Sequence, residues 1–123
     1  MHLATSTPTE SRAEQILRLA QLAVTSVRDG DIHTLGLAGE LDLASAGDVE
    51  AELRRVEATD AEVILVDLAG VSFIDSTGIK VLVTASARER GRNRLLLDRP
   101  SPAVLRVLRM AGVADLLPLV DPA

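Results

Sequence analysis

The fold of this chain is decided by residues 62–90, which read EVILVDLAGVSFIDSTGIKVLVTASARER. The segment opens with a nearly unbroken run of Val, Ile and Leu up to Leu68, a composition typical of a strand that is covered on both faces in a parallel sheet. We expect a loop over residues 69–75, and residues 76–90 then have the length and composition of a helix. The segment therefore predicts a strand, a loop and a helix in succession, as in a βαβ unit.

Upstream of this segment, the sequence predicts a hairpin and another helix. Residues 23–28 and 32–38 are two strand-like runs separated by Asp29-Gly30-Asp31, and Asp-Gly between such runs is a strong hairpin signal. The turn at residues 39–42 leads into an amphipathic helix. Its apolar positions recur at helical spacing, whereas its charged positions are expected outside: Val49, Leu53 and Val56 face inward, and Glu50, Glu52, Arg54 and Arg55 face solvent.

Downstream, residues 93–97 predict a further strand and residues 116–120 a short last one. Ser101-Pro102 supplies a helix cap followed by proline at the first helical position, and Gly112 stands where a C-terminal cap belongs. Strands that alternate with helices predict an α/β fold. We expect a mixed, largely parallel sheet of four to five strands with helices packed mainly on one face.

The chain has 123 residues, which is the size of one domain that buries its core without metals or disulfides. Residues 1–10 are rich in Thr, Ser, Pro and Glu and predict a loose tail. Residues 11–20 contain Ile16, Leu17, Leu19 and Ala20, which would form one short helical face. We therefore expect an N-terminal extension over residues 1–21, a tail plus a short helix, and the folded domain over residues 22–123.

The composition argues against several functions. The formal net charge is -5 and Phe73 is the single aromatic residue, so the chain lacks both the basic surface and the stacking platforms of a nucleic-acid-binding protein. There is no cysteine, and the two histidines are His2 in the tail and His33 in a predicted strand, where we expect it at the surface. Since no phosphate-loop pattern is present either, we expect no cofactor, no metal site, and neither hydrolase chemistry nor nucleotide hydrolysis.

The charges are divided unevenly along the chain. Through Asp75 there are 14 acidic and 5 basic residues, whereas from Ser76 onward there are 4 acidic and 8 basic residues. Four of the basic residues, Arg88, Arg90, Arg92 and Arg94, are interpreted as a solvated helix end rather than a recognition patch. No signal-peptide-like run opens the sequence and no apolar stretch is long enough to span a bilayer, so we expect a cytoplasmic protein without membrane insertion.

The candidate functional residues gather at one edge of the predicted sheet. Three loops, at residues 39–44, 69–75 and 98–100, leave the carboxyl ends of strands, and open α/β sheets bind partners at that edge. Ser76 is a candidate helix cap, where a phosphoryl group would meet the positive end of the helix dipole; a purely structural cap is the alternative. The expected partner-binding residues are Glu40, Asp42, Asp75, Ser76, Thr77, Gly78 and Ser101.

Three sequence blocks together resemble the STAS domain of bacterial anti-sigma-factor antagonists. The blocks are Gly39-Glu40-Leu41-Asp42, residues 66–78 with their ending Asp75-Ser76-Thr77-Gly78, and residues 101–112 beginning Ser101-Pro102. The resemblance covers residues 22–120. It implies that Ser76 is the serine phosphorylated by an anti-sigma factor that is itself an ATP-dependent serine kinase, with Thr77 as the less favoured acceptor.

The resemblance also implies a partner-switching function. The unphosphorylated chain would bind the anti-sigma factor and release a sigma factor, phosphorylation of Ser76 would switch this binding off, and a phosphatase would restore it. The kinase would supply the catalytic groups, so the chain itself would be no enzyme; whether it forms a homodimer stays open. The alternative is a non-phosphorylated STAS binding subunit of a transport complex of the lipid ABC type, or of a sensory complex.

Overall fold

The computed structural model describes residues 12–19 and 21–120 of the chain. Its elements are, in chain order, β1 (Arg12–Leu19), β2 (Leu22–Asp29), β3 (Ile32–Leu41), α1 (Leu43–Glu57), β4 (Val63–Ile74), α2 (Ser76–Glu89), β5 (Leu95–Asp98), α3 (Pro102–Met110) and the 3₁₀ turn η1 (Ala114–Leu116). The hairpin signal at Asp29-Gly30 and the helical periodicities thus correspond to real elements, in the predicted α/β order.

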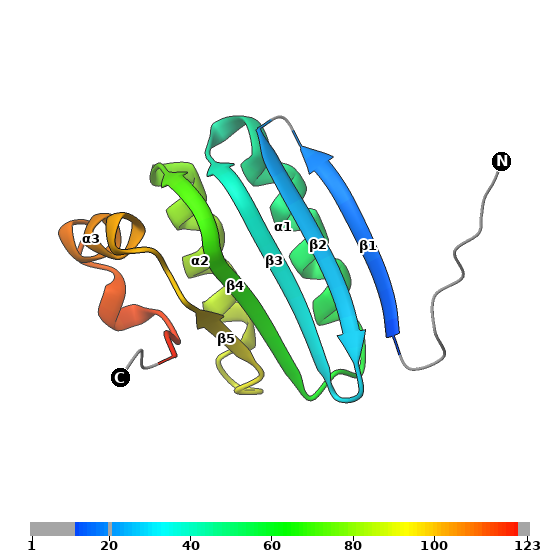
Figure 1. Cartoon of the computed structure of the whole chain (residues 1–123). Coiled ribbons are helices and arrows are strands. Elements are labelled where there is room, and N and C mark those ends of the chain that lie inside the picture. The colour runs from blue at the N-terminus through cyan, green and yellow to red at the C-terminus, as the bar shows by residue number, and fades with distance from the viewer. Residues whose placement is uncertain (1–11, 20, 121–123) are drawn as a thin grey trace, which may run out of the picture.

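The five strands form one sheet in the order β1-β2-β3-β4-β5 (Figure 1). The pairs β1–β2 and β2–β3 are antiparallel, because only two residues of the chain separate consecutive strands. The pairs β3–β4 and β4–β5 are parallel, because α1 and α2 carry the chain back between them. The mixed sheet predicted from the sequence is confirmed, and β3, β4 and β5 point toward the same edge, where β3 and β4 end together at the pair Leu41↔Ile74.

Helices α1 and α2 lie side by side on one face of the sheet, and α3 packs against β4 (Figure 1). Strand β4 therefore alternates: Ile64 and Val66 are buried, whereas Val63 and Leu65 between them are partly exposed. The prediction that this strand is covered on both faces is wrong, because the helices cover mainly one. The predicted inner residues of α1 are all in the core: Val49, Leu53 and Val56.

The expected short helix within residues 11–20 is also wrong. Residues 12–19 form β1, which pairs with β2 along its whole length from Arg12↔Asp29 to Leu19↔Leu22. The unpaired backbone groups along an edge strand such as β2 favour the addition of another strand, and sequence periodicity does not reveal this. The predicted tail lies outside the described residues, and the domain boundary at residue 22 stays a prediction.

Strand β4 is longer than predicted, since residues 69–74, expected as a loop, continue it beside β3 to the pair Leu41↔Ile74. Gly70 permits this close pairing, because a Cβ there would lie 2.8 Å from the Cβ of Ala38. The expected last strand at residues 116–120 is reduced to a single parallel bridge, Leu97↔Leu119, that follows η1.

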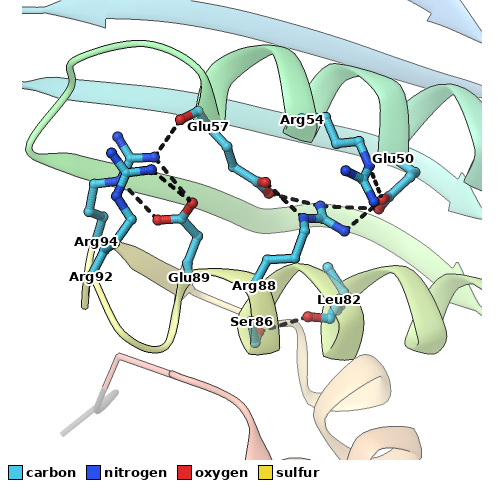
Figure 2. Close-up of polar contacts among 9 residues, drawn as sticks. All are labelled: Glu50, Arg54, Glu57, Leu82, Ser86, Arg88, Glu89, Arg92 and Arg94. Carbon is cyan, nitrogen blue, oxygen red and sulfur yellow. Dashed lines mark hydrogen bonds and ion pairs between the residues drawn. The ribbon is translucent and has the colours of Figure 1, made fainter.

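Arginine side chains join α1, α2 and the start of β5 (Figure 2). Arg88 donates hydrogen bonds to the carboxylates of Glu50 and Glu57, at distances from 2.6 to 3.3 Å. Arg94 is only 7% exposed and donates to the Glu89 carboxylate at 2.9 and 3.1 Å. The expectation that these arginines form a solvated helix end is therefore wrong for Arg94, whose buried charge is paired.

Candidate functional site

Helices α1 and α2 both begin at the sheet edge formed by the carboxyl ends of β3 and β4. Asp42 caps α1, and its carboxylate accepts a hydrogen bond from the Ala44 N–H at 3.0 Å. Asp75 caps α2, and its Oδ1 accepts from the Thr77 and Gly78 N–H groups at 2.9 and 3.0 Å. Ser76, expected as the cap, is instead the first helical residue, because the aspartate before it fills the capping role.

The Asp75 carboxylate also connects the two helices. Its Oδ2 accepts from the backbone N–H of Leu43, the first residue of α1, at 3.3 Å, and its Oδ1 accepts from Thr77 Oγ1 at 2.5 Å. The hydrogen bond from Thr77, followed by that from the Gly78 N–H, holds the pKa of Asp75 below its ordinary value. One ionised carboxylate thus fixes the start of both helices.

Ser76 presents the available hydroxyl of this edge. Its side chain is exposed, and its Oγ has no hydrogen-bond partner within the part of the chain that the structure describes. Thr77, by contrast, is half-buried and its hydroxyl donates to Asp75. A group that approaches from solvent therefore meets Ser76 Oγ first.

Glu40 and Ser101 flank this edge but are engaged in structure. Glu40 is half-buried near the end of β3, and its carbonyl accepts from Ser45 Oγ at 3.0 Å. Ser101 caps α3: its Oγ accepts from the Val104 N–H at 3.2 Å and donates to the Val71 carbonyl at 3.5 Å. The second contact places the start of α3 beside the last part of β4, close to the other candidate residues.

Gly78, which was also predicted to bind a partner, is buried. A Cβ at this position would lie 2.5 Å from the Leu41 carbonyl oxygen and 2.9 Å from Ile74 Cγ1. Only a residue without a side chain lets the first turn of α2 approach β3 and β4 this closely. Gly78 therefore positions Ser76 and offers no side chain of its own to a partner.

Two exposed apolar residues that sequence reasoning did not assign lie near the capping aspartates in the chain. Leu43 at the start of α1 is 76% exposed, and Phe73 near the end of β4 is 50% exposed. Large apolar side chains at an exposed edge are typical of a protein interface. The available signal was Phe73 itself, the single aromatic residue, two positions before the capping aspartate.

An apolar hollow of about 340 Å³ lies between α1 and α2 next to this edge. Its lining is formed by Ala46, Gly47, Glu50, Thr77, Lys80, Val81 and Thr84. Because Thr77 is part of the lining, the hollow is continuous with the first turn of α2. The edge thus combines a free hydroxyl, two ionisable capping carboxyl groups and an apolar recess.

His33 lies apart from this edge and is buried, so the expectation that it is a surface residue is wrong. It is 6% exposed, on the sheet face that α1 covers, and its Nε2 is hydrogen-bonded with Ser26 Oγ at 2.6 Å. Burial and then the positive charges of Arg55 and Arg28 lower the pKa of His33. A buried imidazole of this kind is not positioned to act as a base on an external substrate.

Within residues 12–19 and 21–120, no group of three or more His, Asp or Glu side chains is placed to hold a metal ion. None of the helices described there is long and apolar enough to cross a bilayer. The polar groups of the edge include the exposed Ser76 hydroxyl and the capping carboxyl groups of Asp42 and Asp75.

The family model described as "Mlab, STAS domain" matches residues 24–120. An anti-sigma-B factor antagonist of Listeria monocytogenes is 34% identical over 92 residues, which span 73% of this chain and 80% of the relative. The chain belongs to the STAS domain family. Its similarity to anti-sigma-factor antagonists extends to the anti-sigma-F factor antagonist RsfB of Mycobacterium tuberculosis, 30% identical over 67 residues that span 54% of this chain and 55% of the relative.

Solved structures show that this STAS domain shares its fold with proteins of low sequence identity. An anti-sigma factor antagonist from Mycobacterium paratuberculosis matches with a TM-score of 0.67 and 21% identity, over 97% of this chain and 92% of that one. The unphosphorylated anti-sigma factor antagonist SpoIIAA matches with a TM-score of 0.60 and 20% identity, over 89% of this chain and 90% of that one.

Proposed function

We propose that this STAS domain is a cytoplasmic anti-sigma-factor antagonist and that phosphorylation of Ser76 switches its binding off. The observation that carries the proposal is the exposed, unbonded Ser76 Oγ at the start of α2, beside a threonine hydroxyl that is already engaged. The anti-sigma-B and anti-sigma-F factor antagonists among its relatives support the class of partner. The unphosphorylated chain binds an anti-sigma factor and thereby releases a sigma factor.

The binding surface is the edge around Ser76. Leu43 and Phe73 supply apolar anchors that leave water on binding, and the recess between α1 and α2 accepts an apolar side chain of the partner. Asp42 and Asp75 form part of the polar rim. Since both carboxylates already cap helices, the surface is rigid before binding, which reduces the entropic cost of association.

The switch is electrostatic. Phosphorylation adds close to two negative charges, and the Thr77 and Gly78 N–H groups that would neutralise them are already bonded to Asp75. The phosphate therefore stands next to an ionised carboxylate and faces the partner with concentrated negative charge. Binding weakens because that charge must be desolvated or repelled at the interface.

The chain contributes only the acceptor to the transfer. Ser76 Oγ forms a bond with the γ-phosphorus of ATP and loses its proton, while ADP leaves; the partner serine kinase supplies the nucleotide, the metal and the catalytic groups. A phosphatase hydrolyses the phosphoserine and restores the binding form. The chain itself is no enzyme in this cycle.

The experiment that tests this function is affinity capture from the source organism's lysate with wild type, Ser76→Ala and Ser76→Asp as baits, followed by phosphorylation with the captured kinase and ATP. Wild type and Ser76→Ala should retain an anti-sigma factor, and Ser76→Asp should retain at most about a tenth as much of it. Only wild type should gain phosphate. Ala87→Asp is the matched control, since it adds the same charge at an exposed position near the end of α2. Phosphate on Thr77, or equal capture by Ser76→Asp, contradicts the proposal.

The second candidate function is a constitutive STAS binding subunit of a transport or sensory complex. The observation that favours it is the apolar edge around Leu43 and Phe73, which can bind a partner without any phosphate. Equal capture of a transporter subunit by wild type and Ser76→Asp, with Ser76 unmodified, would favour this function.

A further inference from the structure

The outer side of α3 is exposed and carries a regular stripe of residues. This helix buries only Val104 and Leu108. On its opposite side, residues at spacing i, i+3, i+4 and i+7 are all exposed, namely Ala103, Arg106, Val107 and Met110. Met110 is 80% exposed, the largest value among the described large apolar residues. An apolar stripe that faces away from the core predicts that something else covers it.

A recess lies beside this stripe of α3. A hollow of about 480 Å³ runs along the helix, and its lining is Pro100, Pro102, Leu105, Arg106, Arg109 and Met110. Two of these residues are prolines, Pro100 before the helix and Pro102 at its first position, and each fixes its own backbone φ angle. Arg109 is exposed next to the stripe, so the surface is both apolar and basic.

The charges of this surface have no ion-pair partner among residues 12–19 and 21–120. Within the described part of the chain, neither Arg106 nor Arg109 has a carboxylate within ion-pair distance, although Arg88, Arg94 and Arg99 all have one. Methionine and arginine are also the side chains enriched in the cores of protein interfaces. The chain as a whole carries a charge of -5, so this positive surface stands out locally.

We propose that the outer face of α3, consisting of Ala103, Arg106, Val107, Arg109 and Met110, binds an acidic amphipathic helix of a partner protein. Apolar side chains of that helix pack on Val107 and Met110, and its carboxylates pair with Arg106 and Arg109. This surface is separate from the Ser76 edge, and its binding does not require the phosphorylation switch.

Two other occupants fit the observations less well. In a two-fold contact between copies of this chain, the α3 face would pack on itself and bring arginines of like charge together. An anionic bilayer attracts basic clusters, but this helix has nine residues and two arginines on a chain of net charge -5, which the same bilayer repels. An acidic helix avoids both penalties.

The test uses a synthetic helical peptide with leucine at i, i+3, i+4 and i+7 and flanking glutamates, titrated into the ¹⁵N-labelled full chain. We expect amide chemical-shift changes in fast exchange that are confined to α3 and η1. Fluorescence anisotropy should show that the affinity for the peptide falls as salt is added. Arg106→Glu combined with Arg109→Glu should weaken binding about tenfold or more, and Met110→Gln should weaken it too. Arg54→Glu is the matched control, because Arg54 is an exposed arginine on α1, away from α3 and η1, and its reversal should leave the affinity unchanged.

Several results overturn the proposal. One is equal binding of the same peptide with glutamine in place of glutamate; another is an equal loss with Arg54→Glu, or shift changes outside α3 and η1. Co-sedimentation with phosphatidylglycerol–phosphatidylcholine vesicles that the double reversal abolishes would assign the face to lipid. A dimer in light scattering that Met110→Gln dissociates would assign it to a second copy. Ser76→Asp should leave peptide binding unchanged, so failure of the switch and failure of this surface are distinguishable.

Discussion

Asp75 and Ser76 are adjacent residues with opposite roles, one holding structure and the other open to chemistry. Asp75→Ala removes the acceptor of three backbone N–H groups, on Leu43, Thr77 and Gly78. We expect it to lower the free energy of unfolding by about 1–2 kcal/mol, the range for a lost helix cap. Asp75→Asn keeps an acceptor oxygen, so its free energy of unfolding, measured with urea, should fall by less. Equal losses for both variants would show that charge, rather than capping, is what matters.

Gly78 is required for its small size. Gly78→Ala places a Cβ 2.5 Å from the Leu41 carbonyl oxygen, which belongs to the backbone and cannot move cheaply. We expect a loss of about 1–3 kcal/mol in the free energy of unfolding, as for an overpacked core. Gly47→Ala is the matched control in α1, since nothing lies within 4 Å of its added Cβ. That variant should be stabilised by up to about 1 kcal/mol through helix propensity, and a similar loss in both would contradict the steric argument.

His33 makes stability depend on pH. The groups that face it are Arg55 and Glu52 from α1 and Arg28 and Ser26 from β2, and burial is the main cause of its lowered pKa. The unfolded chain binds a proton at this imidazole near pH 6.5, whereas the folded chain binds it only at lower pH. Above pH 6.5 the neutral imidazole therefore makes its full contribution to the free energy of unfolding. This contribution to the free energy of unfolding declines as the pH falls from 6.5 toward the pKa of the folded state. Below that pKa it no longer changes with pH.

Chemical denaturation across this pH range should therefore show a decrease in the free energy of unfolding toward acid. His33→Gln should remove that decrease, because glutamine does not titrate. His2→Gln is the control that should retain it. An unchanged slope in His33→Gln would assign the pH dependence to carboxyl groups instead.

Among the structural elements, α1, α2 and β5 depend on Arg94 for their mutual position. Besides its pairing with Glu89, its guanidinium donates to the carbonyls of Glu57, Thr59 and Ala61, at 2.6 to 3.0 Å. Arg94→Ala leaves these carbonyls and the buried Glu89 carboxylate without their donor. We expect a loss of about 3–5 kcal/mol, the cost of breaking a buried pair, in thermal or urea unfolding.

The exposed Arg90 provides the comparison for this prediction. It lies on the same turn region but has no ion pair within the described residues. Arg90→Ala should change the free energy of unfolding by no more than about 0.5 kcal/mol, as surface substitutions usually do. Similar small effects for both variants would mean that Arg94 relaxes into solvent.

The elements that sequence reasoning predicted are those with a local signal. The Asp29-Gly30 turn and the spacing of Val49, Leu53 and Val56 depend on neighbours in the chain, and the structure confirms them. The elements that were wrong depend on distant partners: β1 is a strand because β2 offers an edge, and residues 69–74 continue β4 because β3 extends beside them. Periodicity contains no information about such pairing.

The same distinction applies to the polar residues. The Asp75-Ser76 pattern located a helix start correctly to within one residue, because capping is local. The burial of His33 and Arg94 was missed, since their partners come from other elements, as with Ser26 and Glu57. Leu43 and Phe73 were missed because exposure of an apolar residue is decided by which face the helices cover.

In the molecule as a whole, the buried core and the sheet edge that carries Ser76 are separate regions. The core cluster contains residues from β2 to β5 and all three helices, whereas Ser76 is exposed and is not a member of it. Phosphorylation should therefore leave the fold intact and act where the phosphate meets Asp75. Because Asp75 bonds to Leu43 as well as to Thr77 and Gly78, the disturbance should reach the first turn of α1.

This predicts a defined pattern in ¹H–¹⁵N spectra of the phosphorylated chain. Amide shifts should change in the first turns of α1 and α2 and at the ends of β3 and β4, while α3 and the β1–β2 hairpin should not respond. Ser76→Ala treated with the same kinase and ATP is the control and should show no changes. Loss of sheet signals in the phosphorylated chain would mean that the switch works by refolding. Changes in α2 alone would show that the Asp75–Leu43 hydrogen bond does not couple the two helices.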